Sequence, residues 1–548
     1  MEQVDLKDTF SYLLENYTDY VPQNLELPTT PGSIAGLGLA AFVLTVTLFD
    51  YLNYQRQRRK LGNVDIVGDA PYLWRRLRWT ENESNFRAVI QRGYDTFSKK
   101  AKPFAYWGQH DDFILVVPPG VADEVKNVDV DKMSFLQAVE DSYHFRLHTY
   151  ILGRTHVDAV RQSVNKNMNH LHDIVVSQGD EVIPQVLDGF ASSGKSFAAF
   201  LTIWHLVHTV AVAFLIGPQF AANREYMKEI EDYCLNVPGF VHLYFWIPSP
   251  LRRAFWHLSP QGARIRAVIR RLKRFIVPEL RRVVEEWRQT QGPRTESEAG
   301  YTLMGAMLDL KEERGQITRD ASAMSRQEED RQIDIFADEV IFTSFDSAGP
   351  VACLVTQMLF EAVGDKSLVA DLRGEISGVL AAHGGEWTPE AMSSLPRLES
   401  FTRETLRFNG PTLFSVTRSV IQPMQLKSGL SLRPGTIISA PSWLIHNDED
   451  NYARAGEFNP YRFYDEATNT ATTKATTASN KFLAYGYGSQ MCPGRFLGVR
   501  MTQILFAKIL MRYDAEFAGG IKVKPDNIFM PGQVLPPYET EIVIKRRE

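Results

Sequence analysis

The feature that most constrains this chain is a long stretch without charge near its N-terminus. No residue between Glu26 and Asp50 is charged, and residues 32–49 (GSIAGLGLAAFVLTVTLF) form a mostly apolar run. A helix that spans a bilayer needs about 17–25 residues of this kind. The basic run Arg56–Lys60 follows, and basic residues beside a span remain on the cytosolic side. The pattern predicts one membrane-spanning helix. A buried core helix is the alternative, whereas a cleavable signal peptide would carry its basic residues before the apolar run.

The charges also predict how the chain is organised. Residues 1–31 carry one base and six acids, so we expect this tail across the membrane, on the lumenal side. The sequon Asn16-Tyr17-Thr18 would then be a glycosylation site. No repeat or linker interrupts the rest of the chain. The predicted organisation is a lumenal tail over 1–31, a transmembrane anchor over 32–52, a basic linker over 53–63 and one domain over 64–548.

Most of the remaining chain has helical periodicity. Residues 264–276 alternate apolar and basic side chains at three- and four-residue spacing, and Pro278 should end or kink that helix. The apolar run 197–217 is better interpreted as a buried helix than as a second span. Residues 236–258, rich in aromatics and proline, suit either an exposed loop at a membrane surface or a packed hydrophobic cap. The predicted fold class is mainly α with small β-sheets; the strand signals are at 113–117, 437–439 and 541–545.

Charge and cysteine content narrow the class of function. The chain has 60 Lys plus Arg against 65 Asp plus Glu, a net charge of −5. There is no basic excess, so we expect no nucleic-acid partner. Three widely spaced cysteines, Cys234, Cys353 and Cys492, argue against a disulfide framework and favour a reducing compartment.

Cys492 has the most specific local setting, in the segment Tyr485–Arg495 (YGYGSQMCPGR). Glycines on both sides let the backbone approach a flat or bulky group. Pro493 and Gly494 open a long apolar helix, and a cysteine at a helix N-terminus has its thiolate stabilised by unpaired amides. Such a thiolate could be a nucleophile or a metal ligand. No CxxC or neighbouring His/Cys cluster completes a zinc site.

This segment resembles the haem-binding loop of the cytochrome P450 family. Three further signatures occur in that family's order: Thr343–Ala348 for oxygen activation, Glu404-Thr405-Leu406-Arg407 for Glu-x-x-Arg, and Phe458–Phe463 for the segment whose arginine joins that pair. A lone Glu-x-x-Arg means little, because its default interpretation is a surface ion pair. Four signatures in order are very specific, and the resemblance covers about residues 64–548.

The resemblance implies a role for each matching residue. Cys492 would be the axial thiolate of haem b and the metal ligand, and Glu404, Arg407 and Arg462 a structural charge triad. Asp346 and Ser347 would be the catalytic residues that relay protons to dioxygen, and Pro350 would leave the Asp346 carbonyl without its helical donor. The other expected cofactor-binding residues are Arg418, Gln490, Tyr485, Gly488 and Gly494, with His156 and Arg161 near a further propionate position. The expected substrate residues are Phe345, Ala348, Thr412, Leu413, Phe414 and Val416.

Three positions depart from the family pattern. Tyr485 replaces a phenylalanine, which adds a hydroxyl that needs a partner. Gln490 stands where an Arg or His commonly pairs with a haem propionate, and Ser347 replaces a threonine but keeps its hydroxyl. None of these changes removes the thiolate.

The resemblance therefore implies a single-pass monooxygenase of the endoplasmic reticulum with a cytosolic catalytic domain. It would use O2 and NADPH through a P450 reductase, with cytochrome b5 as an optional partner. The wider pattern is similar to fungal, ent-kaurene-oxidase-like members, which implies a hydrophobic, terpenoid-type specialised metabolite as substrate. Two alternatives remain open. One is a reductase-independent haem-thiolate isomerase or dehydratase that acts on a peroxide; the other is a non-catalytic membrane haem-binding protein.

Overall fold

The computed structural model describes residues 31–68, 85–108, 112–149, 154–289 and 302–547. The chain divides between Asn53 and Tyr54 into two structural units. The lumenal tail and its sequon at Asn16 lie outside the described residues, so those predictions are not addressed by the structure.

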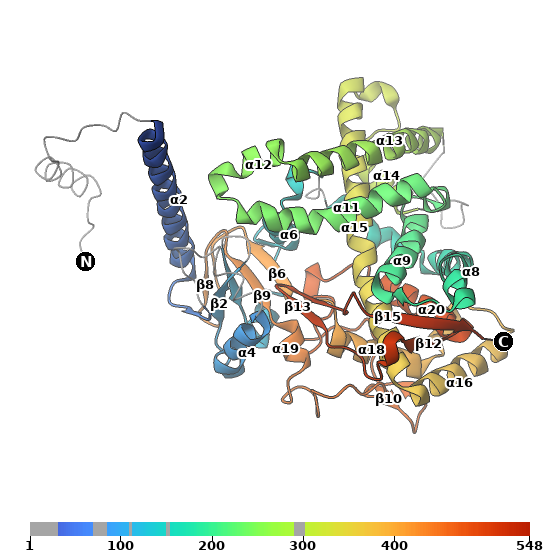
Figure 1. Ribbon diagram of the computed structural model, residues 1–548. Helices are drawn as coiled ribbons and strands as arrows, with labels where there is room; N and C mark the ends of the chain where they lie inside the picture. Colours follow the sequence, from blue (N-terminus) through green and yellow to red (C-terminus); the bar gives the residue numbers. More distant parts are fainter. Residues whose placement is uncertain (1–30, 69–84, 109–111, 150–153, 290–301, 548) are drawn as a thin grey trace, which may run out of the picture. The chain divides into compact units, whose positions relative to one another are not determined.

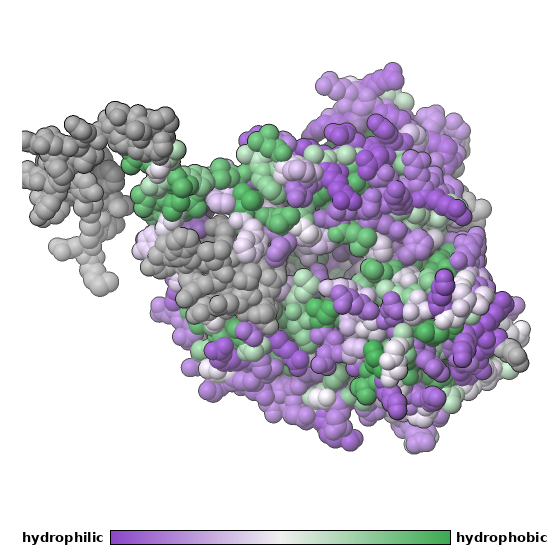
Figure 2. Space-filling model, in the orientation of Figure 1, coloured by the Kyte–Doolittle hydropathy of each residue, from purple (hydrophilic) through white to green (hydrophobic). Residues whose placement is uncertain are grey.

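Helix α2 (Pro31–Leu61) contains the predicted anchor. Within Ala35–Leu61 an 18-residue window has a mean hydropathy of 1.7 and is little buried, so this helix is long and apolar enough to cross a membrane. Figure 2 shows the hydrophobic colouring of this helix. The helix continues without a break through the basic residues. Three of them, Arg58, Arg59 and Lys60, lie in its last turn, where positive charge interacts favourably with the helix dipole. The boundaries of tail, anchor and linker stay a prediction.

The C-terminal end of α2 belongs to the second unit and is packed there. Leu61 is buried, and Lys60 Nζ donates to the Gly435 carbonyl oxygen at 2.9 Å. The Tyr54 ring lies 5.7 Å from that of Trp107 and 5.8 Å from that of Phe113.

The second unit is mainly helical (Figure 1). Its helices are α4 (Phe86–Thr96), α5 (Pro119–Val125), α6 (Phe135–Tyr143), α7 (Thr155–Ala159), α8 (Met168–Ser193), α9 (Ala199–Leu215), α10 (Pro218–Ala221), α11 (Arg224–Trp246), α12 (Arg252–Leu258), α13 (Pro260–Gln289), α14 (Leu303–Glu313), α15 (Arg326–Gly364), α16 (Lys366–Ala382), α17 (Pro389–Ser393), α18 (Pro396–Asn409), α19 (Ser442–His446) and α20 (Arg495–Arg512). Helix α15 packs against α9, α13, α18 and α20, and its long apolar stretch is mostly buried, so it is the central core helix.

The strands are short and form a few small sheets. They are β1 (Asp65–Ile66), β2 (Phe104–Trp107), β3 (Phe113–Val116), β4 (Met133–Ser134), β5 (Phe197–Ala198), β6 (Ser415–Val420), β7 (Met424–Gln425), β8 (Ser431–Leu432), β9 (Ile437–Ala440), β10 (Tyr464–Asp465), β11 (Thr470–Ala471), β12 (Tyr513–Phe517), β13 (Ile528–Met530), β14 (Gln533–Leu535) and β15 (Glu541–Arg546). The largest sheet has the order β1-β2-β3-β9-β6-β4, and β12-β15-β5 form another. The predicted fold class and the three predicted strand regions are confirmed.

Two apolar cores hold this unit together. The larger lies among the helices, and the smaller packs against the six-stranded sheet. The apolar run 197–217 forms β5 and the buried helix α9, as predicted. Residues 236–258 form the end of α11 and then α12 rather than a loop, and Phe240, Phe245 and Trp256 are buried, as a packed cap requires. Contact of this segment with a membrane surface stays a prediction.

Of the two outcomes predicted for Pro278, the end of the helix is wrong, because α13 continues to Gln289, whereas the kink stays a prediction. Proline in a helix costs about 3 kcal/mol. The apolar stripe of α13 is buried on both sides of it, including Leu272, Ile276 and Leu280. Each such side chain contributes about 1.5–3 kcal/mol on burial, so packing outweighs the lost hydrogen bond.

A candidate haem-thiolate site

Cys492 lies in a tight loop that leads into the N-terminus of α20. Its backbone N–H donates to the Tyr485 carbonyl oxygen at 2.8 Å, which closes the loop. The thiol is exposed, and the backbone N–H groups of Gly494 and Arg495 favour the thiolate. Desolvation has the opposite and larger effect, and the Asp346 carboxylate adds to it. Together they raise the pKa of Cys492 to about 11. A thiol of this kind is a poor free nucleophile, whereas a bound cation deprotonates it, so the metal-ligand interpretation is favoured.

Asp346 lies opposite, on the central helix α15. Its side chain is accessible, yet desolvation raises its pKa, and its charge acts on Cys492. A side chain that is accessible and yet strongly desolvated faces an enclosed space, because the outer surface would leave it hydrated. We call the space that Cys492 and Asp346 face the interior hollow. Pro350, four residues later, lacks an N–H and frees the Asp346 carbonyl oxygen from helical bonding. Ser347 Oγ donates to the Ser344 carbonyl oxygen at 3.4 Å.

The backbone of the cysteine loop depends on Gly488. Its φ of +80° is in the left-handed region, and a Cβ there would lie 2.0 Å from the Lys126 carbonyl oxygen. The next residue, Ser489, donates its N–H to that same oxygen at 2.9 Å. A side chain at Gly488 would therefore break the loop away from residue 126. At Gly494 a Cβ would meet its nearest neighbour only at 4.0 Å.

Gln490 anchors the loop to the main chain of a neighbouring segment. Its Oε1 accepts from Phe135 N at 2.9 Å, and its Nε2 donates to the carbonyl oxygens of Met133 at 2.8 Å and Val128 at 3.4 Å. These bonds use most of the hydrogen-bonding capacity of the amide. A propionate contact by Gln490 stays a prediction.

Arg418 is a buried cation beside this loop. Its side chain reaches the carbonyl oxygens of Thr417 at 2.9 Å and Tyr487 at 3.5 Å, and its Nε has no hydrogen-bond partner among the described residues. Burial lowers its pKa to about 10. A β-bulge in β6 directs the side chain, and Val416 within it has a φ of +55°, which is strained for a β-branched residue. A buried guanidinium of this kind needs an anion.

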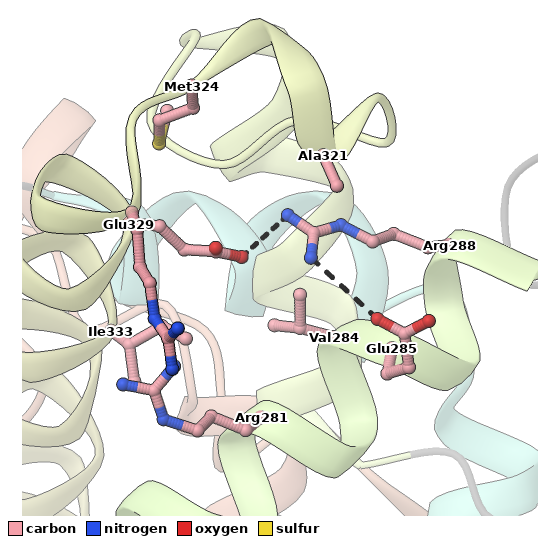
Figure 3. A pocket seen from close by; sticks show the side chains of 9 residues that line it. Arg281, Val284, Glu285, Arg288, Ala321, Met324, Glu329 and Ile333 are labelled. Atoms are coloured by element: carbon pink, nitrogen blue, oxygen red, sulfur yellow. Dashed lines mark hydrogen bonds and ion pairs between the residues drawn. The ribbon is translucent and has the colours of Figure 1, made fainter.

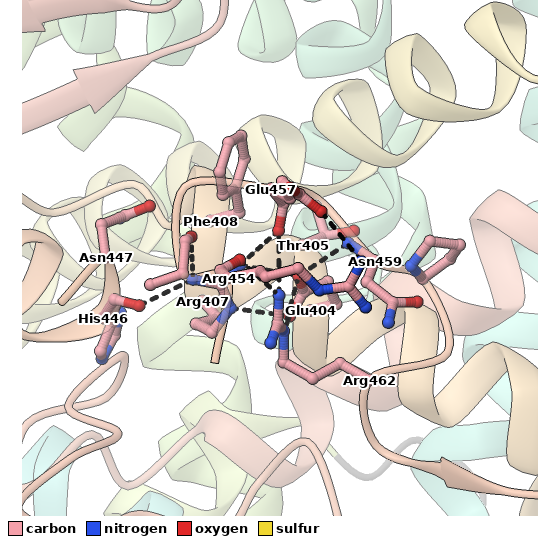
Figure 4. Close-up of polar contacts among 12 residues, drawn as sticks. Glu404, Thr405, Arg407, Phe408, His446, Asn447, Arg454, Glu457, Asn459 and Arg462 are labelled. Atoms are coloured by element: carbon pink, nitrogen blue, oxygen red, sulfur yellow. Dashed lines mark hydrogen bonds and ion pairs between the residues drawn. The ribbon is translucent and has the colours of Figure 1, made fainter. Parts of the chain in front are cut away.

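The charge triad joins Glu404 and Arg407 on α18 to Arg462 of a later loop (Figure 4). Arg407 Nε and Nη2 donate to the two carboxylate oxygens of Glu404, each at 2.7 Å, and Arg462 Nε donates to both at 3.1 Å. Asn459 N donates to the same carboxylate at 2.9 Å. The remaining Arg407 donors reach the carbonyl oxygens of residues 446, 455 and 457. Both Glu404 and Arg407 are fully buried, and every donor of Arg407 is satisfied.

His446 links the triad to the cysteine loop, and the sequence gives no signal for it. Its carbonyl oxygen accepts from Arg407, and its ring Nε2 accepts from Leu483 N at 2.7 Å, just before the loop. Its ring stacks on that of Phe482, and burial lowers its pKa to about 3, so it is neutral. The contact fixes where the loop begins.

The other predicted residues divide between the hollow and the cores. Tyr485 is beside Cys492, and its hydroxyl has no partner among the described residues. Arg161, in a single π-helical turn, donates to the Ser489 carbonyl oxygen, whereas His156 packs on Phe342.

Phe345 is partly buried in an aromatic cluster. The side chains buried in the two cores are those of Ala348, Leu413, Phe414 and Val416; substrate contact by these four stays a prediction.

A separate pocket of about 330 Å³ lies between α13 and the start of α15 (Figure 3). Two of its arginines are paired with acids: Arg288 with Glu329 at 2.6 Å, and Arg281 with Asp330 at 2.6 Å. The charges in this pocket are largely compensated, so it is not the haem site. Among the described ranges, no group of three or more His, Cys, Asp or Glu side chains could hold a metal ion.

A large helical domain with an accessible cysteine facing an interior hollow defines the class of thiolate-ligated cofactor proteins. The family model for cytochrome P450 matches residues 164–544. The chain is 62% identical over 512 residues, 93% of this chain and 99% of the relative, to the cytochrome P450 monooxygenase verB of Clonostachys rogersoniana. It is 27% identical to the bicoumarin synthase desC of Aspergillus desertorum, over 89% of this chain and 93% of that one.

The fold comparison agrees with the sequence comparisons. The structure of retinoic acid-bound cyanobacterial CYP120A1 matches with a TM-score of 0.62 at 15% identity, and covers 88% of this chain and 99% of that one. The chain therefore belongs to the cytochrome P450 family, and the prediction of a monooxygenase of that family is confirmed.

The residues present fit the haem that this family implies. Cys492 is the one exposed cysteine and could supply a thiolate ligand, and Arg418 is a buried cation without an anionic partner among the described residues. Gly488 lets the backbone of the loop pack closely against Lys126. The donor set therefore matches a flat, anionic, metal-bearing group.

Proposed function

We propose that the chain is a haem-thiolate monooxygenase that inserts one oxygen atom of O2 into a hydrophobic specialised metabolite. The observation that carries the proposal is the accessible Cys492 thiol in a loop that faces Asp346. Cys492 would hold the haem iron as a thiolate, and the bound haem would supply dioxygen activation, which a thiolate ligand favours.

The residues of the chain have distinct tasks in this proposal. Arg418 would neutralise a haem propionate, because its guanidinium is buried and its Nε has no partner among the described residues. The Asp346 carboxyl, with a pKa raised by desolvation, can hold and release a proton at its oxygens. The Ser347 hydroxyl can donate and accept beside it.

Electrons would come from NADPH through a P450 reductase, with cytochrome b5 as an optional donor. We place the protein in the endoplasmic reticulum membrane through α2, with the catalytic domain in the cytosol and a glycosylated lumenal tail. The apolar helix and its basic last turn support this arrangement.

For the substrate, the resemblance to ent-kaurene-oxidase-like enzymes supports a terpenoid. A coumarin-type aromatic substrate is the second candidate, because relatives from Aspergillus desertorum and Aspergillus niger are named bicoumarin synthases.

The test is a difference spectrum of the reduced, carbon monoxide-bound protein for the wild type and for Cys492→His. We expect the red-shifted Soret band of a thiolate ligand in the wild type and its loss in the variant. Cys353→Ala is the matched control: Cys353 is buried in α15, so this variant should keep the band. A wild type that binds haem without the band would contradict the assignment of Cys492.

Oxygen and NADPH consumption separates the proposal from its alternatives. A monooxygenase couples both to product formation. Product formed from a peroxide without reductase would instead support the isomerase or dehydratase, and haem binding without any turnover would support the non-catalytic protein.

A further inference from the structure

The β13–β14 hairpin pairs with the segment that precedes β6. Gln533 and Thr412 are opposite each other in an antiparallel bridge, flanked by Leu413 N donating to the Gly532 carbonyl oxygen and Val534 N donating to the Pro411 carbonyl oxygen. Directly opposed residues share one face of a sheet, and this bonding pattern brings their side chains closest. Val534, the next residue, is fully buried in the smaller core. The Gln533 and Thr412 side chains therefore point away from that core.

Tyr143, the last residue of α6, meets Gln533 on that face. Gln533 Nε2 donates to the Tyr143 hydroxyl oxygen at 3.5 Å. The Tyr143 ring lies 5.6 Å from the ring of Phe145, which in turn lies 5.5 Å from that of Phe345 on α15. Two segments nearly 400 residues apart thus form a polar pair at the edge of an aromatic wall.

The pair belongs to the same interior space as the site. Tyr143 is only partly exposed, and its pKa is raised mainly by desolvation and also by the charge of Asp346. The ring contacts that begin at Tyr143 end at Phe345, the residue next to Asp346 in α15. Packed side chains therefore join the pair to the part of α15 that carries Asp346.

The pair has unused hydrogen-bonding capacity. The Tyr143 O–H has no acceptor among the described residues, and neither Gln533 Oε1 nor the Thr412 hydroxyl has a partner there. A phenolic donor thus lies beside an amide acceptor, against aromatic rings. This arrangement complements a ligand in which a carbonyl oxygen adjoins an N–H or O–H, as in a lactam.

We propose that Tyr143 and Gln533 form a specificity subsite for substrates that carry a ring carbonyl next to a hydrogen-bond donor, the class represented by aromatic lactams. Tyr143 donates to the carbonyl oxygen, and Gln533 Oε1 accepts from the neighbouring N–H. Thr412 lies beside the pair. The inference rests on the proposed function, since it names the substrate class of the same site.

Three bicyclic probes of similar size test it: 2-quinolone offers acceptor and donor, coumarin an acceptor only, and naphthalene neither. Dissociation constants for the full-length holoprotein are measured by equilibrium dialysis, which does not depend on a haem spectral response. We compare wild type with Tyr143→Phe and Gln533→Leu, and with Tyr452→Phe as control. The Tyr452 hydroxyl donates to the Lys481 carbonyl oxygen, outside the subsite.

Tyr143→Phe should weaken 2-quinolone and coumarin by about fivefold to tenfold, the effect of one lost hydrogen bond, and change naphthalene less than twofold. Gln533→Leu should weaken 2-quinolone alone, and Tyr452→Phe should change none of the three. The proposal is overturned if Tyr143→Phe leaves all probes unchanged, if it weakens naphthalene as much as 2-quinolone, or if 2-quinolone does not bind to the wild type. The carbon monoxide spectrum of the same preparations reports the proposed function separately.

Discussion

Replacing Glu404 with glutamine should strongly destabilise the protein although the side chain keeps its size. The carboxylate accepts two N–H groups from Arg407, one from Arg462 and one from the Asn459 backbone. The neutral amide of Glu404→Gln has a single acceptor oxygen, and its NH2 would face cationic donors. At least two hydrogen bonds to charged groups are then lost, at about 1.5–3 kcal/mol each.

The expected loss is therefore about 3–5 kcal/mol, the size found when one partner of a buried ion pair is removed. This is a large share of a domain's net stability of about 5–15 kcal/mol. Proteins of this size often unfold irreversibly, so we would measure both the urea midpoint by far-UV circular dichroism and the half-life at a fixed urea concentration. Both should fall, and haem retention should fall with them.

Glu457→Gln is the matched control. Its carboxylate pairs with Arg454 at 3.4 Å, and the two side chains are 64% and 74% exposed. Such a surface pair contributes about 0–1 kcal/mol. If Glu404→Gln is no less stable than Glu457→Gln, the triad does not hold this region together and the reasoning is refuted.

Three further predictions concern other parts of the molecule. Gly488→Ala should abolish the thiolate band of the carbon monoxide complex, because a Cβ there would lie 2.0 Å from a backbone oxygen. Gly494→Ala should keep the band, because a Cβ there would meet its nearest neighbour at 4.0 Å. Equal spectra for the two variants would contradict the loop geometry. Glu339→Ala should cost about 3–5 kcal/mol in urea unfolding, because it leaves the fully buried Lys311 without its partner at 2.6 Å, whereas replacing both by methionine should be close to neutral. Burial raises the pKa of Asp338 from 3.8 to about 6, above its unfolded value, so its contribution to stability is present below pH 3.8 and lost as the pH rises through 6. Between pH 3.8 and 6 the wild type should therefore lose stability relative to Asp338→Asn, by at most about 3 kcal/mol. A difference in unfolding free energy that does not change with pH would contradict this role of Asp338.

Much of this protein could be predicted from local sequence. An uncharged apolar run followed by bases is a local pattern, and it identified α2 as the candidate span. The cysteine loop and Glu-x-x-Arg are also local, since Glu404 and Arg407 are one helical turn apart and must meet on one face of α18. Their order along the chain identified the family, which the comparisons confirm.

Sequence failed where the outcome depended on what a segment packs against. Pro278 is a helix breaker in isolation, but the buried stripe of α13 overrides it. Residues 412–416 are apolar or small, so they could equally line a pocket or a core. In the structure Leu413, Phe414 and Val416 are buried in the smaller core, whereas Thr412, which pairs with Gln533 of the β13–β14 hairpin, is only partly buried.

What the sequence determined by itself is the apolar candidate span, the helical class and the family, because each depends on patterns within short stretches of chain. Only the tertiary structure decided which distant groups meet. His446 joins the triad to the cysteine loop, and Tyr143 reaches Gln533. These contacts have no fixed spacing in the sequence, because they are made by helices and loops that come together only when the two cores form.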